Sequence, residues 1–166
     1  MSTEEYLDLV DENDRVISRE KRSIIYEKGL KNYRVVNVFI KNSKDQLWIP
    51  RRTNKKMFPY CLDMSMGGHV SSKESYEEAL ARELREELNL DVKDCKIKLL
   101  GYINPFKDIV SSFMKVYEIQ MDDTPKYNKK DFSEYYWLTS KEILQKIAGG
   151  EKTKYDFPIL IKKFYI

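Results

Sequence analysis

The sequence predicts a mixed α/β fold in which strands and helices are interleaved rather than strictly alternating. Runs dense in β-branched and aromatic residues, such as VVNVFIKN and KIKLLGYI, have the composition of strands. Segments with helical periodicity lie between and after them, SYEEALARELREEL above all. The length of 166 residues suits one ordinary domain, and 42% of the residues are hydrophobic. We therefore expect a single domain over residues 1–166 with its own layered core.

The first half of the chain predicts two β-hairpins. Residues 6–17 alternate apolar side chains around the turn segment DEND, which indicates an N-terminal hairpin. The polar stretch 18–30 carries no predicted element. VVNVFIKN and QLWIPRR, joined by the turn NSKD, predict a second hairpin in the middle of the sheet. The segment TNKKMFPYC is expected to be a loop that leads through LDMSMGGHV into the long helix.

The second half predicts further strands and two more helices. KIKLLGYI and SSFMKVYEIQM indicate strands, and YYWL a shorter one. SKEILQKIAGG indicates a helix with Ser140 as N-cap and Gly149 just past its end. DFPILIKKF indicates a last helix, after which no repeat or low-complexity tract remains to be assigned.

Composition and charge limit the classes of partner. The N-terminal segment is acidic and has no apolar signal region, and no run approaches the roughly 20 apolar residues of a membrane span. Two cysteines, Cys61 and Cys95, lack CxxC spacing and suit a reducing compartment as structural residues. A net charge of +3 gives no indication of nucleic-acid binding. We expect a cytoplasmic protein with no membrane or nucleic-acid partner.

The long central helix has clear signals at both ends. Ser75 is a good N-cap, and Glu78 three residues later completes a capping box, so the helix is expected to begin at Tyr76. Asn89 follows the last apolar position and favours the left-handed conformation that ends a helix. Leucines at every fourth position from 80 to 88 form an apolar stripe that faces a core.

Three carboxylates crowd beside that stripe. At about 100° per residue, Glu83, Glu86 and Glu87 fall within one arc, and the small residue Ala79 leaves room one turn back. Like charges at this spacing destabilise a helix, and a divalent cation removes the repulsion. Carboxylate oxygens suit Mg²⁺ or Mn²⁺. A solvated acidic helix face is the alternative on the carboxylates alone.

The spacing around the helix resembles a known motif. From Gly68 the sequence continues with five residues, Glu74, seven residues and then RELREELNL, which ends at residue 90. This resembles the Nudix box, G-x5-E-x7-R-E-U-x-E-E-x-G-U, at every fixed position but one. The exception is Asn89, where the family has Gly, and Asn is the mildest replacement at a left-handed helix end. A match at this many positions over residues 68–90 is a strong signal.

The resemblance implies a fold, a reaction and a cofactor. Nudix proteins are α/β/α sandwiches around a mixed sheet, and they hydrolyse diphosphate linkages in nucleoside diphosphate derivatives and related organic diphosphates with Mg²⁺ or Mn²⁺. The expected partner is therefore a small-molecule diphosphate substrate. A homodimer is also compatible with the family, although no feature of the sequence decides it.

The resemblance also assigns residues. The metal ligands would be Glu83, Glu86, Glu87 (the box glutamates) and the backbone oxygen of Gly67 or Gly68. Arg82 would orient the box glutamates through Glu74, so that Arg82, Glu83 and Glu86 form the expected catalytic group. A glutamate must accept the proton of the attacking water, and Glu83 is the first choice. Acidic residues of later segments are the alternatives: Glu118, Asp122 and Asp131.

Outside the box, the lead-in from residue 7 to 52 and the segment FPYCLDMSMGGHV are similar to the Nudix branch related to isopentenyl-diphosphate isomerase. A true isomerase carries a catalytic Cys just before the Gly-His of its box and a second, histidine-rich metal site. Here Gly67 stands at the Cys position, and the only histidine is His69, for which a structural role is expected. The positions near Tyr33 and Asn37 hold no metal-binding side chain. The sequence therefore favours a hydrolase over an isomerase.

Substrate contacts are less sharply indicated. Arg51 and Arg52, and with them Lys55 and Lys56, precede the box and could bind phosphates. Tyr60, Phe106 and Tyr136 are candidates for stacking on a base or lining a prenyl pocket, with core packing as the alternative. A third function class is a non-catalytic Nudix-fold module that binds a nucleotide or a protein. Such modules usually lose box glutamates, which are all present here.

Overall fold

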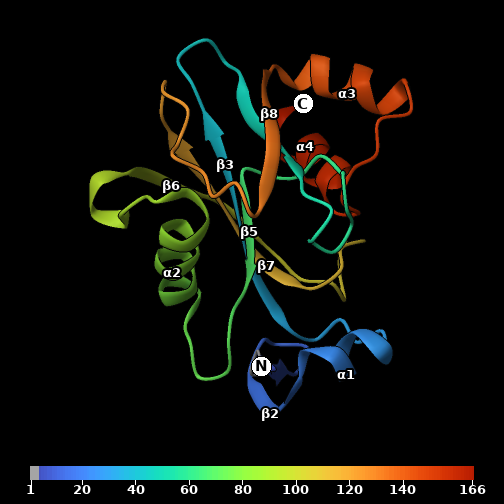
Figure 1. Ribbon diagram of the computed structural model, residues 1–166. Helices are drawn as coiled ribbons and strands as arrows, with labels where there is room; N and C mark the ends of the chain where they lie inside the picture. The colour runs from blue at the N-terminus through green and yellow to red at the C-terminus, as the bar shows by residue number, and fades with distance from the viewer. Residues whose placement is uncertain (1–3) are drawn as a thin grey trace.

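The computed structural model describes residues 4–166 and contains a six-stranded mixed sheet with helices on both faces (Figure 1). The sheet strands are β3 (Arg34–Lys41), β4 (Leu47–Arg52), β5 (Met66–His69), β6 (Lys96–Ile103), β7 (Phe113–Gln120) and β8 (Phe132–Leu138). Their order is β6-β7-β3-β4-β8, and β5 pairs with β3 off this path. Only β3 and β7 run parallel to each other, whereas the other paired strands are antiparallel. The predicted α/β/α sandwich around a mixed sheet is confirmed.

The alternation of side chains along β3 builds two cores. Val36, Val38 and Ile40 pack with the leucines of α2 (Tyr76–Leu88) on one face of the sheet. Phe39 points to the other face and packs with residues of α3 (Ser140–Ala148) and α4 (Phe157–Tyr165). Figure 1 shows α2 on one side of the sheet and α3 and α4 on the other. The middle strand is therefore buried on both faces, as its continuous apolar run requires.

The N-terminal segment forms a small unit of its own (Figure 1). It comprises β1 (Tyr6–Val10), β2 (Val16–Lys21) and α1 (Arg22–Glu27), and the two strands pair only with each other as a sheet. Asp14, in the turn of this hairpin, accepts hydrogen bonds from Arg34 Nε (2.6 Å), Tyr76 Oη (2.8 Å) and Tyr102 Oη (3.1 Å). This carboxylate therefore ties the hairpin to β3, α2 and β6 at once.

The ends of α2 match their prediction. Ser75 accepts a hydrogen bond from the backbone N–H of Glu78, and the Glu78 side chain accepts one from the Ser75 N–H, which is a complete capping box. Asn89 closes the helix in the left-handed conformation, with φ 53°. Gly149 likewise follows the last residue of α3, as predicted.

Several element boundaries differ from the predictions. The N-cap of α3 is Thr139 rather than Ser140, because the Thr139 side chain and Glu142 form the capping box. The predicted first hairpin is present, but its second strand continues to Lys21 and leads into α1, which was not expected. The strand expected at YYWL begins earlier, at Phe132. A short 3₁₀ turn, η1 (Val92–Asp94), was also missed.

The sequence did not predict the strand β5, which contributes Gly67 and Gly68 to the site. Its sequence, MGGH, has no β-branched residue, so its conformation comes from pairing with β3 rather than from propensity. None of the helices within residues 4–166 combines the length and apolar character needed to span a membrane.

Candidate active site

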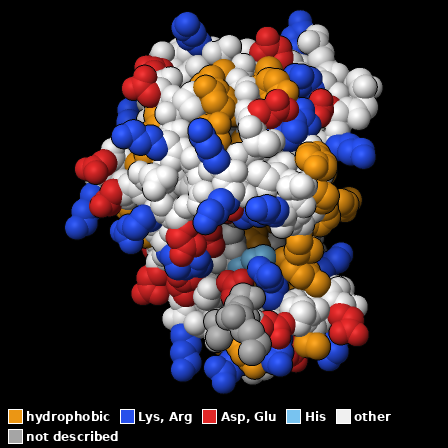
Figure 2. Space-filling model, in the orientation of Figure 1, with side chains coloured by type: hydrophobic (Ala, Val, Ile, Leu, Met, Phe, Trp, Pro, Cys, Tyr) orange, Lys and Arg blue, Asp and Glu red, His pale blue; other side chains and the backbone are white. Residues whose placement is uncertain are grey.

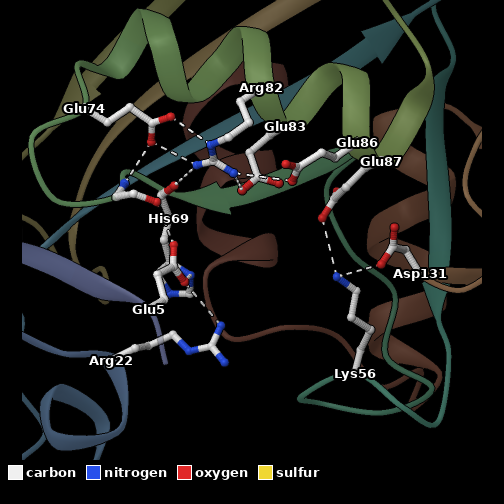
Figure 3. Close-up of polar contacts among 11 residues, drawn as sticks. Glu5, Arg22, Lys56, His69, Glu74, Arg82, Glu83, Glu86, Glu87 and Asp131 are labelled. Atoms are coloured by element: carbon white, nitrogen blue, oxygen red, sulfur yellow. Dashed lines mark hydrogen bonds and ion pairs between the residues drawn. The ribbon is translucent and has the colours of Figure 1, made fainter. Parts of the chain in front are cut away.

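Arg82 is the centre of the acidic cluster on α2 (Figure 3). Its Nε and Nη2 donate to the two carboxylate oxygens of Glu74 at 2.8 and 2.9 Å, a bidentate pair. Its Nη1 donates to Glu83 at 2.7 Å and lies 3.4 Å from Glu86. Nη2 also donates to the backbone oxygen of His69 at 3.0 Å, which links the helix to β5. The expected contact between Arg82 and Glu74 is therefore present.

Burial and the charge of Arg82 shift the pKa values of Glu74 and Glu83 in opposite directions. Burial raises the pKa of Glu74, but the hydrogen bonds from Arg82 and from the Ser71 N–H outweigh it, so the net pKa is lowered. For Glu83 burial is the larger effect, and its pKa is raised although Arg82 opposes this. Glu83 therefore has a carboxyl group with a raised pKa, and Arg82 holds that group in position.

Glu87 lies at the other side of the cluster, where Lys56 bridges it to Asp131 (Figure 3). Lys56 Nζ is 3.5 Å from Glu87 and 2.9 Å from Asp131. Burial raises the pKa of Glu87 to about 8, although the Lys56 charge opposes the shift. Burial outweighs the ion pair here because the pair is long and because Glu87 Oε2 is buried with no hydrogen-bond partner.

The glycines of β5 allow the closest approach of strand and helix. Gly68 pairs with Val36, and a Cβ at Gly68 would lie 2.3 Å from the Glu83 side chain. Gly67 pairs with Asn37, and a Cβ there would lie 2.9 Å from Asn37 Oδ1. A methyl group at Gly68 would therefore displace the Glu83 side chain, and one at Gly67 would displace the Asn37 amide.

The cluster opens into a cavity of about 1160 Å³. One end is lined by Arg82, the box glutamates, Lys56, Asp131 and the Gly67–Gly68 backbone. The lining also includes residues of the N-terminal unit and of later loops, among them Ile25, Leu30, Tyr33, Val110, Ser111 and Asp156. Figure 2 shows this region as a hollow between the main body and the N-terminal unit, with charged side chains around it and the pale-blue histidine inside.

The acidic end fits a hard divalent cation by its chemistry. Within residues 4–166, no three His, Cys, Asp or Glu side chains converge as a finished metal site. The reason is that Glu83 and Glu86 are turned toward Arg82, while Glu87 is turned toward Lys56. The three carboxylates nevertheless line one cavity together with the Gly67–Gly68 backbone, and one oxygen of Glu87 is buried without a partner. An all-oxygen donor set with an unsatisfied carboxylate suits Mg²⁺ or Mn²⁺.

Of the four basic candidates for substrate binding, three line the cavity and one does not. Arg52 lines the cavity but is engaged with Asp63 at 2.6 Å, and both side chains are buried. Arg51 does not line the cavity and is bound to Glu134 and Glu151. Its expected contact with substrate is therefore not supported by its position. Lys55 and Lys56 both line the cavity.

The three acidic candidates for the general base that come later in the chain lie in different parts of the structure. Asp131 lines the cavity next to Lys56. Glu118 is buried elsewhere and accepts a hydrogen bond from Tyr165 at 2.8 Å. Asp122 accepts one from the backbone N–H of Ser43 at 2.7 Å, outside the cavity lining. Among these three, only Asp131 lies where a substrate could reach it.

The aromatic candidates Tyr60, Phe106 and Tyr136 do not line the cavity. The aromatic lining residues come from other positions that sequence reasoning missed: Tyr26, Tyr33, Phe58 and Tyr155. No local signal marks them, because their role follows from the way four separate segments meet.

His69 is held as a structural residue. Its Nε2 shares a hydrogen bond with the Tyr26 hydroxyl, and Nδ1 lies 3.9 Å from Glu5. Burial, with smaller effects from the charges of Lys154 and Arg22, lowers its pKa to about 3, so the ring is neutral. Neither cysteine lines the cavity, which leaves no thiol where isomerase chemistry would require one.

Comparison with known proteins agrees with this geometry. A family model described as the NUDIX domain matches residues 31–157. The chain is 55% identical over 162 residues to an uncharacterized Nudix hydrolase from Nostoc sp., covering 97% of this chain and 96% of that protein. It is 45% identical over 166 residues to a Nudix hydrolase from Deinococcus radiodurans, with 98% and 95% covered.

A solved structure and a more distant relative complete the comparison. The fold matches a crystal structure from Deinococcus radiodurans with a TM-score of 0.92 and 45% identity, covering 98% of this chain and all of that one (100%). An isopentenyl-diphosphate Delta-isomerase from Kocuria rhizophila is 24% identical over 161 residues, covering 94% of this chain and 88% of the isomerase.

Proposed function

The chain belongs to the Nudix hydrolase family, and from this membership and the geometry of the cavity we propose that it hydrolyses a diphosphate linkage in a nucleoside diphosphate derivative or related organic diphosphate, with Mg²⁺ or Mn²⁺ as cofactor. One observation carries the proposal. The three box glutamates and the Gly67–Gly68 backbone face the same cavity, and Arg82 holds two of these glutamates in place.

The residues have distinct roles in this proposal. The box glutamates and the backbone oxygen of Gly67 or Gly68 would hold the cation. A bound divalent cation neutralises phosphate charge and lowers the pKa of a coordinated water. Arg82 is a positioning residue, since its bidentate pair with Glu74 fixes the guanidinium that contacts Glu83.

Glu83 is the proposed general base. It is partly buried, its pKa is raised by burial, and it faces the cavity beside Gly68. A raised pKa strengthens a carboxylate as a proton acceptor near neutral pH. Asp131 is the alternative, because it is the candidate from a later segment that lies in the cavity.

The test is phosphate release from a panel of nucleoside diphosphates and triphosphates, sugar and dinucleoside diphosphates, and prenyl diphosphates, with Mg²⁺ or Mn²⁺. Native protein is compared with Glu83→Gln, Asp131→Asn and the matched control Glu77→Gln. Glu77 lies on the same helix, but its exposed side chain pairs with Lys115 outside the cavity. We expect metal-dependent turnover that falls by about 10²-fold or more in Glu83→Gln and is unchanged in the control.

Other outcomes identify the alternatives. A larger loss in Asp131→Asn than in Glu83→Gln would assign the base to Asp131. Absence of turnover on the whole panel, with folded protein that still binds Mn²⁺ in an electron paramagnetic resonance titration, would favour a binding module. Interconversion of isopentenyl and dimethylallyl diphosphate would favour the isomerase, against the glycine at position 67.

A further inference from the structure

Lys154, in the loop between α3 and α4, faces the same cavity as the box glutamates. Its Nζ lies 3.6 Å from the position that a Cβ on Gly67 would take, so the ammonium group stands beside the glycine pair of β5. Asn37 Oδ1 lies near the same Gly67 position. A cation is thus placed next to the backbone that would help to hold the metal, although the residue lies far along the chain from the box.

The backbone around Lys154 is fixed rather than loosely placed. Its N–H donates to the oxygen of Leu62 at 3.0 Å, and the Leu62 N–H donates to the oxygen of Lys152 at 2.9 Å. Thr153 forms a bridge with Leu62, and Leu62 itself is fully buried. The position of Lys154 is therefore set by strand-like pairing with the segment that leads into β5.

Among the lining cations of residues 4–166, Lys154 alone combines partial burial with the lack of an anionic partner. Arg22, Arg52, Lys56 and Arg82 are all engaged in ion pairs. Lys31 and Lys55 are exposed to solvent. Within residues 4–166, Lys154 is the partly buried lining cation for which no ion pair or side-chain hydrogen bond is formed. A positive charge held at such a place is available to an anionic ligand.

Its place along the cavity indicates which part of a ligand it meets. On one side lie Gly67 and the box glutamates. The next residues of the same loop, Tyr155 and Asp156, also line the cavity, and Asp156 accepts a hydrogen bond from the N–H of Ser111, another lining residue, at 3.0 Å. Lys154 therefore links the glycine pair beside the box glutamates to the part of the lining formed by Asp156 and Ser111.

We propose that Lys154 determines diphosphate specificity by binding the second phosphoryl group, the one farther from the box glutamates and joined to the organic part of the substrate. The inference rests on the proposed hydrolase function, because it assigns that site's second phosphate. Lys binds phosphate as a point charge, so the ammonium group tolerates different oxygen positions along the reaction.

The test is calorimetric binding of two probes, methylenediphosphonate and inorganic phosphate, in the presence of Mg²⁺. The P–C–P bridge of the first probe prevents hydrolysis, so the readout is affinity and not turnover. We expect Lys154→Met to weaken diphosphonate binding by roughly tenfold to a hundredfold, the range for a hydrogen bond to a charged group. The same variant should change phosphate binding much less, because a single phosphate is held at the acidic end. Lys154→Arg should restore most of the diphosphonate affinity.

Lys152→Met is the matched control, since Lys152 is exposed in the same loop and does not line the cavity. It should leave both affinities unchanged, and thermal unfolding should confirm that each variant is folded. Equal diphosphonate binding by native protein and Lys154→Met would overturn the assignment, as would equal loss of both probes or no binding of diphosphonate by the native protein. Lys154-dependent binding without turnover on the substrate panel would refute the hydrolase and keep the assignment.

Discussion

Replacement of Glu87 by Gln should make the metal-free protein more stable at neutral pH. Glu87 is 7% exposed, one of its oxygens has no hydrogen-bond partner, and burial raises its pKa from 4.5 to about 8. Ionisation of such a group is unfavourable in the folded protein, where the charge is buried, but not in the unfolded chain, where water solvates it. Gln has a similar shape without the ionisation, and Lys56 keeps its partner Asp131.

The direction in which the free energy of unfolding changes with pH follows from the linkage between protonation and folding. A carboxyl group with a raised folded-state pKa contributes its full stability below the unfolded pKa, near 4.5, and loses it as the pH rises through about 8. At 1.36 kcal/mol per pKa unit, the loss reaches about 3 kcal/mol at pH 7 and about 5 kcal/mol well above pH 8. The variant lacks this loss, so its free energy of unfolding should exceed that of the native protein at pH 7.

The assay is urea unfolding in EDTA at pH 5, 6, 7 and 8. The difference in unfolding free energy between Glu87→Gln and native protein should grow steadily with pH. Mg²⁺ should then narrow the difference, because a ligand at 100 times its Kd stabilises the native protein by about 2.7 kcal/mol and the variant has lost a carboxylate ligand. Parallel pH profiles in EDTA would refute the reasoning, since they would mean that Glu87 is ionised at no cost.

Three further changes test the geometry around the site. Arg82→Lys keeps the charge but loses the paired N–H donors, so kcat should fall at least about tenfold, whereas Arg85→Lys on the exposed face should leave kcat unchanged. Asn89→Ala should lower the free energy of unfolding in urea by about 1 kcal/mol, because its φ of 53° is unfavourable for Ala. Asp14→Asn should cost about 2 kcal/mol in the same assay, since Arg34 loses a charged partner; an unchanged midpoint would show that the hairpin is held by other contacts.

The helix α2 could be predicted from the sequence because its signals are local. Ser75 and Glu78 lie three residues apart, and Asn89 immediately follows the last helical residue, so each can be recognised without knowledge of the rest of the fold. The spacing of the box glutamates on one helix face follows from helix geometry alone. The acidic end of the cavity was therefore predictable.

The rest of the site depends on long-range pairing. β5 is extended because it pairs with β3, and its glycines give no sign of strand propensity. Asp131 and Lys154 reach the cavity from distant segments, and nothing in their neighbouring residues marks them. Arg51 and Arg52 illustrate a constraint that sequence reasoning could have used. Adjacent residues of a strand point to opposite faces, so only one of the two could face the cavity.

The charge balance at the acidic end explains why a cation and an anionic substrate would belong together there. In the ion-pair network around this end, five carboxyl groups share two cations: Glu74, Glu83, Glu86, Glu87 and Asp131 with Arg82 and Lys56. Even with Glu87 protonated, the other four carboxylates outnumber Arg82 and Lys56, so this network holds net negative charge that disfavours a diphosphate beside it. A divalent cation reverses that balance, while Lys154 offers positive charge to the remainder of the ligand. Diphosphonate binding should therefore require Mg²⁺, because Lys154 alone does not outweigh the carboxylates beside it.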